Sequence, residues 1–86
     1  MGIFRLHYTS IMKTDYLTKG KHDELELELA ELKLNRRKEV AERLEFAKSL
    51  GDLSENAEYH AAREEQTEIE ERINQLELLL KTSEIV

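Results

Sequence analysis

Two apolar stripes at helical spacing, joined by one short turn, restrict the fold of this 86-residue chain more than any other feature. The first stripe starts at Leu25 and returns every three or four residues to Ala47, and the second runs from Ala57 to Leu80. Because the connection around Gly51 is short, the helices must lie antiparallel and bury their stripes against each other. The stripes comprise Leu25, Leu29, Leu32, Val40, Leu44 and Ala47, interrupted at Arg36, and then Ala57, Ala61 or Ala62, Ile69, Ile73, Leu76 and Leu80.

The sequence therefore predicts an all-α fold, a long antiparallel two-helix coiled-coil hairpin with an acidic tip. The composition agrees, because 37% of the residues are charged and proline is absent, as in long solvated helices. The first helix is expected from Thr18, as its N-cap, to Leu50, before a glycine that suits a helix end. The second is expected from Leu53 to Thr82. At about 1.5 Å per residue the hairpin is roughly 45 to 50 Å long.

The two ends of this hairpin differ in the sequence. Around the turn the stripes consist mostly of alanine, so the turn end is slender. The opposite end, the base, carries additional leucines outside the stripes. Such a surface suits another domain, a second copy of the chain or the N-terminal segment, and self-association through the apolar base is one expectation. The additional residues are Leu27, Leu34, Leu78 and Leu79.

Charge and composition exclude several functional classes. A net charge of −6 argues against a general coating of nucleic acid, which requires many basic residues. The absence of cysteine fits a reducing cytoplasm, and no segment approaches the roughly 20 apolar residues of a membrane span. The chain lacks a cysteine nucleophile, a glycine-rich phosphate loop and a histidine pair at ligand spacing. We therefore expect a cytoplasmic protein that contacts no membrane and is not itself an enzyme.

Asp52 and Glu55 stand three residues apart at the turn and allow two interpretations. In the first they cap the second helix, with Asp52 as N-cap and Glu55 at the third helical position, as in a capping box. In the second they are an exposed pair of hard oxygen ligands of the kind that Mg²⁺ takes alongside phosphate oxygens. A D-x-x-E pattern alone does not choose between them.

The surrounding stretch GDLSENAEYHAAREEQ resembles the tip signature of the bacterial Gre transcript-cleavage factors, with the GreA-type tip as the closer fit. The resemblance covers residues 12–86 and implies that residues 16–86 are the N-terminal coiled-coil domain of that family. Residues 1–15 are then an N-terminal extension, with Met12 as the natural initiator. The resemblance also implies that these 86 residues do not include the family's second, C-terminal domain, which resembles the FKBP fold.

The resemblance implies a role for both acids in trans. Asp52 and Glu55 would enter the secondary channel of a backtracked bacterial RNA polymerase and help to hold its second catalytic Mg²⁺. The polymerase would then cut its own transcript by two-metal hydrolysis. The Mg²⁺ would be shared with the polymerase active centre and is not expected to bind tightly to the isolated chain.

Other residues near the turn take roles from the same resemblance. Lys48 and Arg63 would form a basic patch that contacts the 3′ end of the nascent RNA. The alternative is that both are solvated charges, paired with Glu45 or Glu64.

Four further residues, Ser54, Asn56, Tyr59 and His60, would support the tip. Many relatives carry proline where this chain has Lys38, so we expect a straighter first helix here.

Three functions therefore compete. The first is a transcript-cleavage factor domain, for which the segment DLSEN has the cleavage-competent pattern. The second is a regulator that occupies the polymerase channel and inhibits without cleavage, as relatives with altered tip acids do. The third is a structural coiled coil that dimerises and binds no polymerase.

Overall fold

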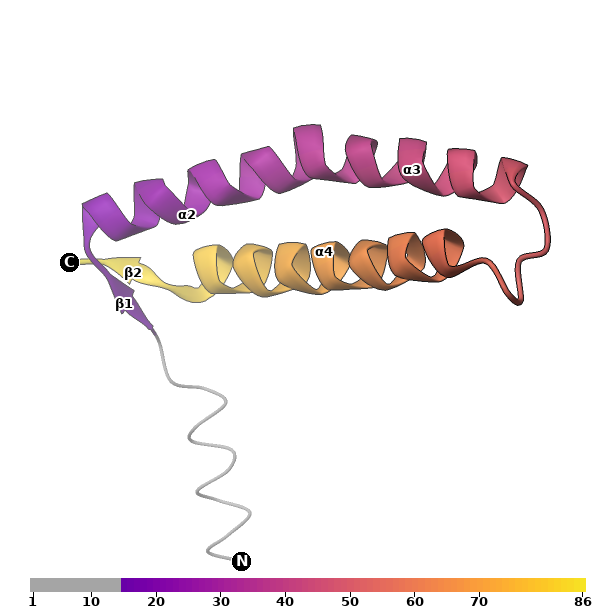
Figure 1. Cartoon of the computed structure of the whole chain (residues 1–86). Helices are drawn as coiled ribbons and strands as arrows, with labels where there is room; N and C mark the ends of the chain where they lie inside the picture. Colours follow the sequence, from indigo (N-terminus) through magenta and orange to yellow (C-terminus); the bar gives the residue numbers. More distant parts are fainter. Residues whose placement is uncertain (1–14) are drawn as a thin grey trace, which may run out of the picture.

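In the computed structural model, which describes residues 15–86, the chain forms a long hairpin of two helical arms (Figure 1). The predicted all-α hairpin is confirmed. The prediction for residues 1–14, including Met12, lies outside the described residues. In chain order the elements are strand β1 (Tyr16–Leu17), helix α2 (Lys19–Glu31), the π-helical turn η1 (Leu32–Arg36), helix α3 (Arg37–Ser49), helix α4 (Ala57–Thr82) and strand β2 (Glu84–Ile85).

The first arm begins and ends where the sequence predicts. Thr18 is the N-cap, and its side-chain oxygen accepts a hydrogen bond of 3.1 Å from the backbone N–H of Lys21. The last helical residue is Ser49, followed by Leu50 as C-cap. Gly51 then adopts a φ of 79°, the left-handed conformation that lets a chain leave a helix without steric cost.

The core is one narrow seam between the arms. Val40, Ile69 and Ile73 form its centre, against which Leu29 and Leu32 pack. The second stripe is confirmed from Ala62 onward, whereas Ala57 and Ala61 are exposed. The buried apolar residues of the described chain are Leu25, Val40, Leu44, Ala47, Ala62, Ile69, Ile73 and Leu76.

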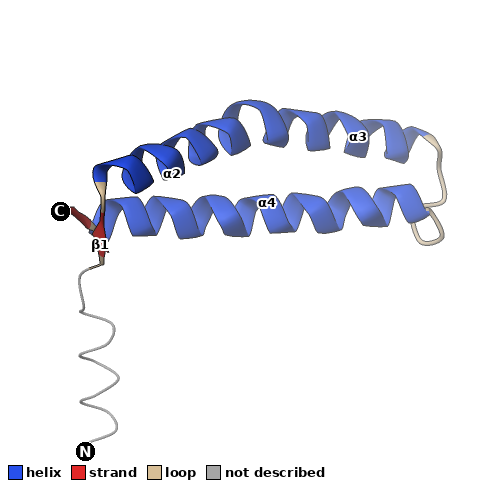
Figure 2. Cartoon of the chain, turned by 60° about the vertical axis from the view of Figure 1, so that its left-hand side comes forward, coloured by secondary structure: helices blue, strands red, loops and turns tan. Residues whose placement is uncertain are grey.

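The first arm is bent. The five residues of η1 form a π-helical turn just before Lys38, and the backbone N–H of Arg37 bonds to the carbonyl oxygen of Leu32. That this helix is straighter than in relatives with proline stays a prediction. A π-turn bends a helix because it inserts an additional residue into one turn. The first arm accordingly arches away from α4 near the junction of α2 and α3 (Figures 1 and 2).

A mismatch between the two stripes explains this turn. In α4 the buried residues keep a seven-residue spacing, as Ala62, Ile69 and Leu76 show. A seven-residue repeat that starts at Leu25 would place position 39 against α4. Val40 is buried there instead, and the later buried residues of α3 are shifted by the same single residue. The π-turn absorbs this additional residue, so both halves of the arm face the same partner.

Ion pairs flank the seam along its length. The Arg37 guanidinium donates two hydrogen bonds to the Glu70 carboxylate, at 2.8 and 2.7 Å, and Arg72 does the same to Glu28, at 2.7 and 2.9 Å. These arginines hold the pKa of Glu70 and of Glu28 below the ordinary value. The other pairs across the seam are Lys33 with Glu77, and both Arg36 and Arg43 with Glu65.

Arg36, which interrupts the first stripe, lies half-buried at the edge of the seam. Its guanidinium shares Glu65 with that of Arg43. Hydrogen bonding from Arg43 is the largest cause that lowers the pKa of the Glu65 carboxyl.

The base of the hairpin brings both ends of the described chain together. Strands β1 and β2 pair in parallel, with Tyr16 opposite Glu84 and Leu17 opposite Ile85. The N–H of Glu84 donates to the Asp15 carbonyl at 2.8 Å, which extends this pairing. These strands are two residues long and carry no periodic signal, so the sequence does not predict them.

Large apolar side chains are exposed at both ends of the hairpin. Leu27 and Leu78 are exposed near the base, as the sequence predicts. Leu34 is also exposed but lies in η1 at the middle of the first arm, and Leu79 is half-buried, so the prediction is wrong for these two residues. At the turn end Phe46, Leu50 and Leu53 are also exposed, which the prediction of a slender alanine-rich end missed. Within residues 15–86, no helix combines the length and the apolar character that crossing a membrane requires.

Candidate functional site at the hairpin tip

The tip is a loop of irregular backbone between Leu50 and Asn56, at the end of the hairpin opposite to β1 and β2 (Figure 1). Asn56 is the N-cap of α4, and its Oδ1 accepts a hydrogen bond of 2.9 Å from the N–H of Tyr59. The predicted start of this helix at Leu53, with Asp52 as its cap, is therefore wrong. The loop is longer because the chain must reverse direction before the helix can begin.

Asn56 also closes the loop from within. Its Nδ2 donates to the carbonyl oxygen of Ala47 at 2.6 Å and to that of Gly51 at 3.3 Å. The Ala47 carbonyl lies in the last turn of α3 and also accepts from the N–H of Leu50, whereas Gly51 follows the helix end. The half-buried side chain of Asn56 thus forms hydrogen bonds with the end of α3 and with the start of α4. These bonds fix the distance between the arms at the tip.

Asp52 occupies a strained position at the outer edge of the loop. Its φ is 44°, in the left-handed region, where aspartate is one of the few residues other than glycine that is tolerated. The Ser54 hydroxyl donates to Asp52 Oδ1 at 3.2 Å, and the N–H of Glu55 donates to the Asp52 carbonyl at 3.1 Å. The local turn therefore orients the Asp52 carboxylate.

The side of the loop that faces α4 is held by His60. Its Nε2 lies 3.1 Å from the Ser54 carbonyl oxygen, and since a carbonyl only accepts, Nε2 carries the proton. The ring of Tyr59 packs edge-on against that of His60, with centroids 5.6 Å apart. All four residues predicted to support the tip therefore make contacts there. Ser54 lies within the loop and bonds to Asp52, Asn56 closes the loop, and His60 bonds to the Ser54 carbonyl. Tyr59 bonds to Asn56 through its N–H and packs against His60.

The two acids remain available to a partner. Asp52 and Glu55 are both exposed, and neither forms an ion pair within residues 15–86. The described part of the chain also holds no group of three or more acidic, histidine or cysteine side chains that could enclose a metal ion. The tip therefore presents two exposed carboxylates and no larger cluster of such ligands within the described residues.

Comparison of the sequence with known proteins shows the family of this chain. Residues 15–85 match the family model for GreA and GreB, described as "Transcription elongation factor, N-terminal". The chain belongs to the GreA/GreB family. It corresponds to the N-terminal domain of a GreA-like elongation factor.

Curated Gre relatives share about half of the residues in the matched region. The chain is 55% identical to transcription elongation factor GreA of Chloroherpeton thalassium over 71 residues, which cover 83% of this chain and 45% of the relative. It is 50% identical to GreA of Halalkalibacterium halodurans over 74 residues, or 86% of this chain and 47% of the relative. It is also 53% identical to GreA of Clostridioides difficile over 70 residues, or 81% and 44%. The chain therefore spans less than half the length of these relatives.

In this Gre domain the two predicted basic residues lie near the tip on opposite arms. Lys48 is an exposed residue of the last turn of α3, and Arg63 is exposed on the second turn of α4. The Arg63 guanidinium donates a long hydrogen bond of 3.4 Å to Gln66. Within residues 15–86 neither residue forms an ion pair with Glu45 or Glu64, and both side chains are exposed. Their contact with RNA and the alternative of solvated charges both stay predictions.

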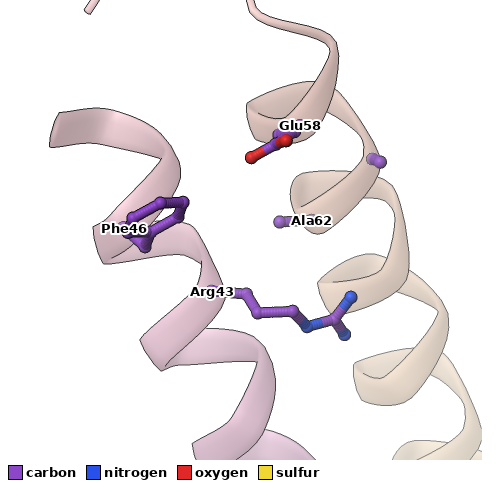
Figure 3. Close-up of a pocket in the computed structure, with 5 residues that line it drawn as sticks. Arg43, Phe46, Glu58 and Ala62 are labelled. Carbon is purple, nitrogen blue, oxygen red and sulfur yellow. The ribbon is translucent and has the colours of Figure 1, made fainter. Parts of the chain in front are cut away.

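A shallow pocket of about 370 Å³ lies between the arms of the Gre domain, close to the tip (Figure 3). Phe46 stands at its rim on α3 and is 61% exposed, and Glu58 lies across from it on α4. Arg43 reaches toward α4 at the other end of the pocket, and Ala62 forms its floor (Figure 3). The sequence did not predict this pocket. Phe46 precedes Ala47 of the apolar stripe, and the one-residue shift at η1 turns Ala47 toward α4 and Phe46 outward.

Proposed function

We propose that this chain is a transcript-cleavage factor domain whose tip enters the secondary channel of a bacterial RNA polymerase in the cytoplasm. There it stimulates cleavage of the nascent transcript in backtracked complexes. The chain is not an enzyme on its own, and the hydrolytic activity belongs to the polymerase. The proposal rests on membership of the Gre family and on the carboxylates at the tip.

The observation that carries the proposal is that Asp52 and Glu55 have no structural task that a capping box would give them. Asn56 caps α4 and closes the loop instead. Both carboxylates are exposed at the far end of a narrow hairpin, where desolvating them would be costly unless a cation or hydrogen-bond donors received them. A partner that encloses the tip must supply such groups.

A Mg²⁺ ion held mainly by the polymerase fits this donor set. Mg²⁺ prefers oxygen ligands and usually takes only one or two protein carboxylates beside water and phosphate. When bound, such an ion would lower the pKa of a water and stabilise the charge that develops on the phosphate. Asp52 and Glu55 would be the residues of this chain that hold it, with Asp52 oriented by Ser54.

The basic residues support contact with RNA. Lys48 and Arg63 are exposed within a few turns of the acids, and a displaced RNA 3′ segment would bring phosphates to that level. Because two cations neutralise few phosphates, they would position a segment rather than bind RNA strongly by themselves.

The test is a cleavage assay on a stalled, backtracked RNA polymerase complex with labelled RNA and Mg²⁺. The parent chain should shorten the RNA, and D52N and E55Q should each lower the rate by about tenfold or more, since even supporting groups of a metal site are worth that much. Asparagine tolerates the left-handed backbone at position 52, so the loop should persist. E58Q is the matched control, because it removes an exposed acid from the first turn of α4 and should leave cleavage unchanged.

The assay also separates the competing functions. Binding to the polymerase with slower elongation and no shortened RNA would replace this proposal with an inhibitory regulator of the channel. Failure to bind the polymerase at any concentration would favour a structural coiled coil. Equal cleavage by the parent and D52N would refute the role of the tip acid.

A further inference from the structure

The tip end of the hairpin has two sides of different chemistry, which the ion pairs across the seam distinguish. Arg37 pairs with Glu70 on one side. Lys48 lies eleven residues, or about three helical turns, after Arg37 and therefore on the same side of α3. Arg63 lies seven residues, or about two turns, before Glu70 and therefore on the same side of α4. We call the side that carries Lys48 and Arg63 the basic side.

The other side of the tip end carries exposed apolar residues, and we call it the apolar side. Phe46 and Leu50 are 61% and 55% exposed, and they adjoin because they lie about one helical turn apart. Phe46 precedes Lys48 by two residues, which places it about 200° around α3 from the basic side. Ala61 and Ala62 of α4 share the pocket of Phe46 between the arms (Figure 3). The apolar side thus lies beside the seam and continues toward the tip.

The charges around Phe46 exclude RNA from the apolar side. Three carboxylates and one guanidinium line the two shallow pockets beside Phe46. The guanidinium, that of Arg43, already pairs with Glu65 across the seam. A phosphate on this side would therefore meet more negative than positive charge, whereas the basic side attracts phosphates. The four charged residues that line these pockets are Glu39, Glu42, Arg43 and Glu58.

We propose that Phe46 and Leu50 dock against an apolar stretch of the protein wall of the polymerase channel. The hairpin then enters the channel in one rotational orientation, with its basic side toward the RNA. This inference rests on the proposed function. Phe46 precedes Asp52 by six residues, so a channel that encloses the tip also encloses Phe46. Its neighbours there are protein and RNA, and the charges leave the protein as the occupant of the apolar side.

The residue types on the apolar side suit a protein partner. Aromatic residues are enriched in the centre of protein interfaces, where charged residues are depleted. Residues 1–14 join the chain at the base, at the opposite end of the hairpin from Phe46. A second copy would place the same carboxylates of both chains against each other, because a two-fold contact pairs a patch with itself. Both other occupants are therefore disfavoured.

The first test locates the neighbour of Phe46 directly. The full 86-residue chain with p-benzoylphenylalanine in place of Phe46 is irradiated in a backtracked RNA polymerase complex that contains labelled RNA. We expect crosslinks to a polymerase subunit and none to RNA. The same photoreactive residue in place of Arg63, on the basic side, is the matched control and should crosslink RNA.

The second test separates docking from the chemical step. Cleavage is measured against the concentration of the chain, which gives a half-saturating concentration and a maximal rate. F46Q should raise the half-saturating concentration by about tenfold, and the maximal rate should stay within about twofold of the parent. F46L keeps an apolar side chain and should stay within about threefold of the parent. L27Q removes a comparably exposed side chain near the base and should change neither value.

The outcomes keep this inference apart from the proposed function. D52N should show the opposite result, a lower maximal rate at an unchanged half-saturating concentration. An unchanged half-saturating concentration for F46Q, or an RNA crosslink from position 46, overturns the docking of Phe46 and leaves the role of Asp52 intact. A parent that does not bind the polymerase, as followed by the anisotropy of a labelled chain, overturns both.

Sedimentation of the free chain examines the second copy as an occupant. We expect the parent and F46Q to sediment alike. A dimer of the parent that F46Q abolishes would assign the apolar side to a second copy and overturn the inference. Circular dichroism of each variant shows that the helices are intact.

Discussion

Replacement of Asn56 should loosen the tip more than any other single change in the loop. N56A removes the side-chain cap on the N–H of Tyr59, which is worth about 1 kcal/mol. It also removes the bonds to the carbonyls of Ala47 and Gly51, each worth about 1 kcal/mol or less when partly exposed. The free energy of unfolding should therefore fall by about 2 to 3 kcal/mol, a large part of what so small a domain has.

A second variant divides this loss into its two parts. N56S keeps an oxygen that can cap α4 as well as asparagine does, but it has no amide N–H to donate across the loop. Its loss should be about 1 to 2 kcal/mol, between the parent and N56A. Urea unfolding followed by circular dichroism measures both differences, provided that the slope with urea is unchanged. If N56A costs less than about 0.5 kcal/mol, the argument that Asn56 holds the loop together is refuted.

Two further predictions concern the arms. Arginines across the seam lower the pKa of the carboxyls of Glu28, Glu65 and Glu70 in the folded chain. The ion pairs therefore contribute their full stability above the ordinary carboxyl pKa of about 4.3. That contribution is lost as the pH falls through the lowered pKa values. Thermal unfolding in an acid titration should show that decline, and a melting temperature that is constant down to pH 2 would contradict it. Deleting Asn35 should convert η1 to regular helix and keep the core in register, so the variant should unfold within about 1 kcal/mol of the parent. Deleting Glu42 instead rotates the rest of α3 by about 100° and should abolish cooperative unfolding, which hydrogen exchange can verify.

The general architecture could be predicted because its signals are local and repeated. Thr18 and Gly51 are residue types that begin and end helices, and the seven-residue spacing through Ile69 and Leu76 continues for several turns. The π-turn could not be read from the same spacing, since steps of three and four also fit an ordinary helix. Only comparison of the two arms reveals the additional residue before Val40.

The loop shows why the site was predicted less well than the arms. Asp52 and Asn56 are both favourable caps, and the pattern from Asp52 to Glu55 fits a capping box. Which residue caps depends on how many positions the chain needs to reverse after Gly51, and that number follows from the distance between the arms. The left-handed backbone of Asp52 and the bond from Asn56 to Ala47 are products of that closure. Neither could be obtained from residue types alone.

The pairing of β1 with β2 holds the hairpin at its base and leaves the tip as the free end. Both ends of the described chain leave through β1 and β2, so any force or attachment transmitted by the backbone acts there. With the tip about 45 Å away, a rotation of ~5° at the base displaces the Asp52 carboxylate by ~4 Å. Metal and substrate geometry tolerates only about 0.5 Å. Under the proposed function, the groups of the polymerase that enclose the tip would therefore set the final alignment of the acids, and the base would decide only whether the tip reaches them.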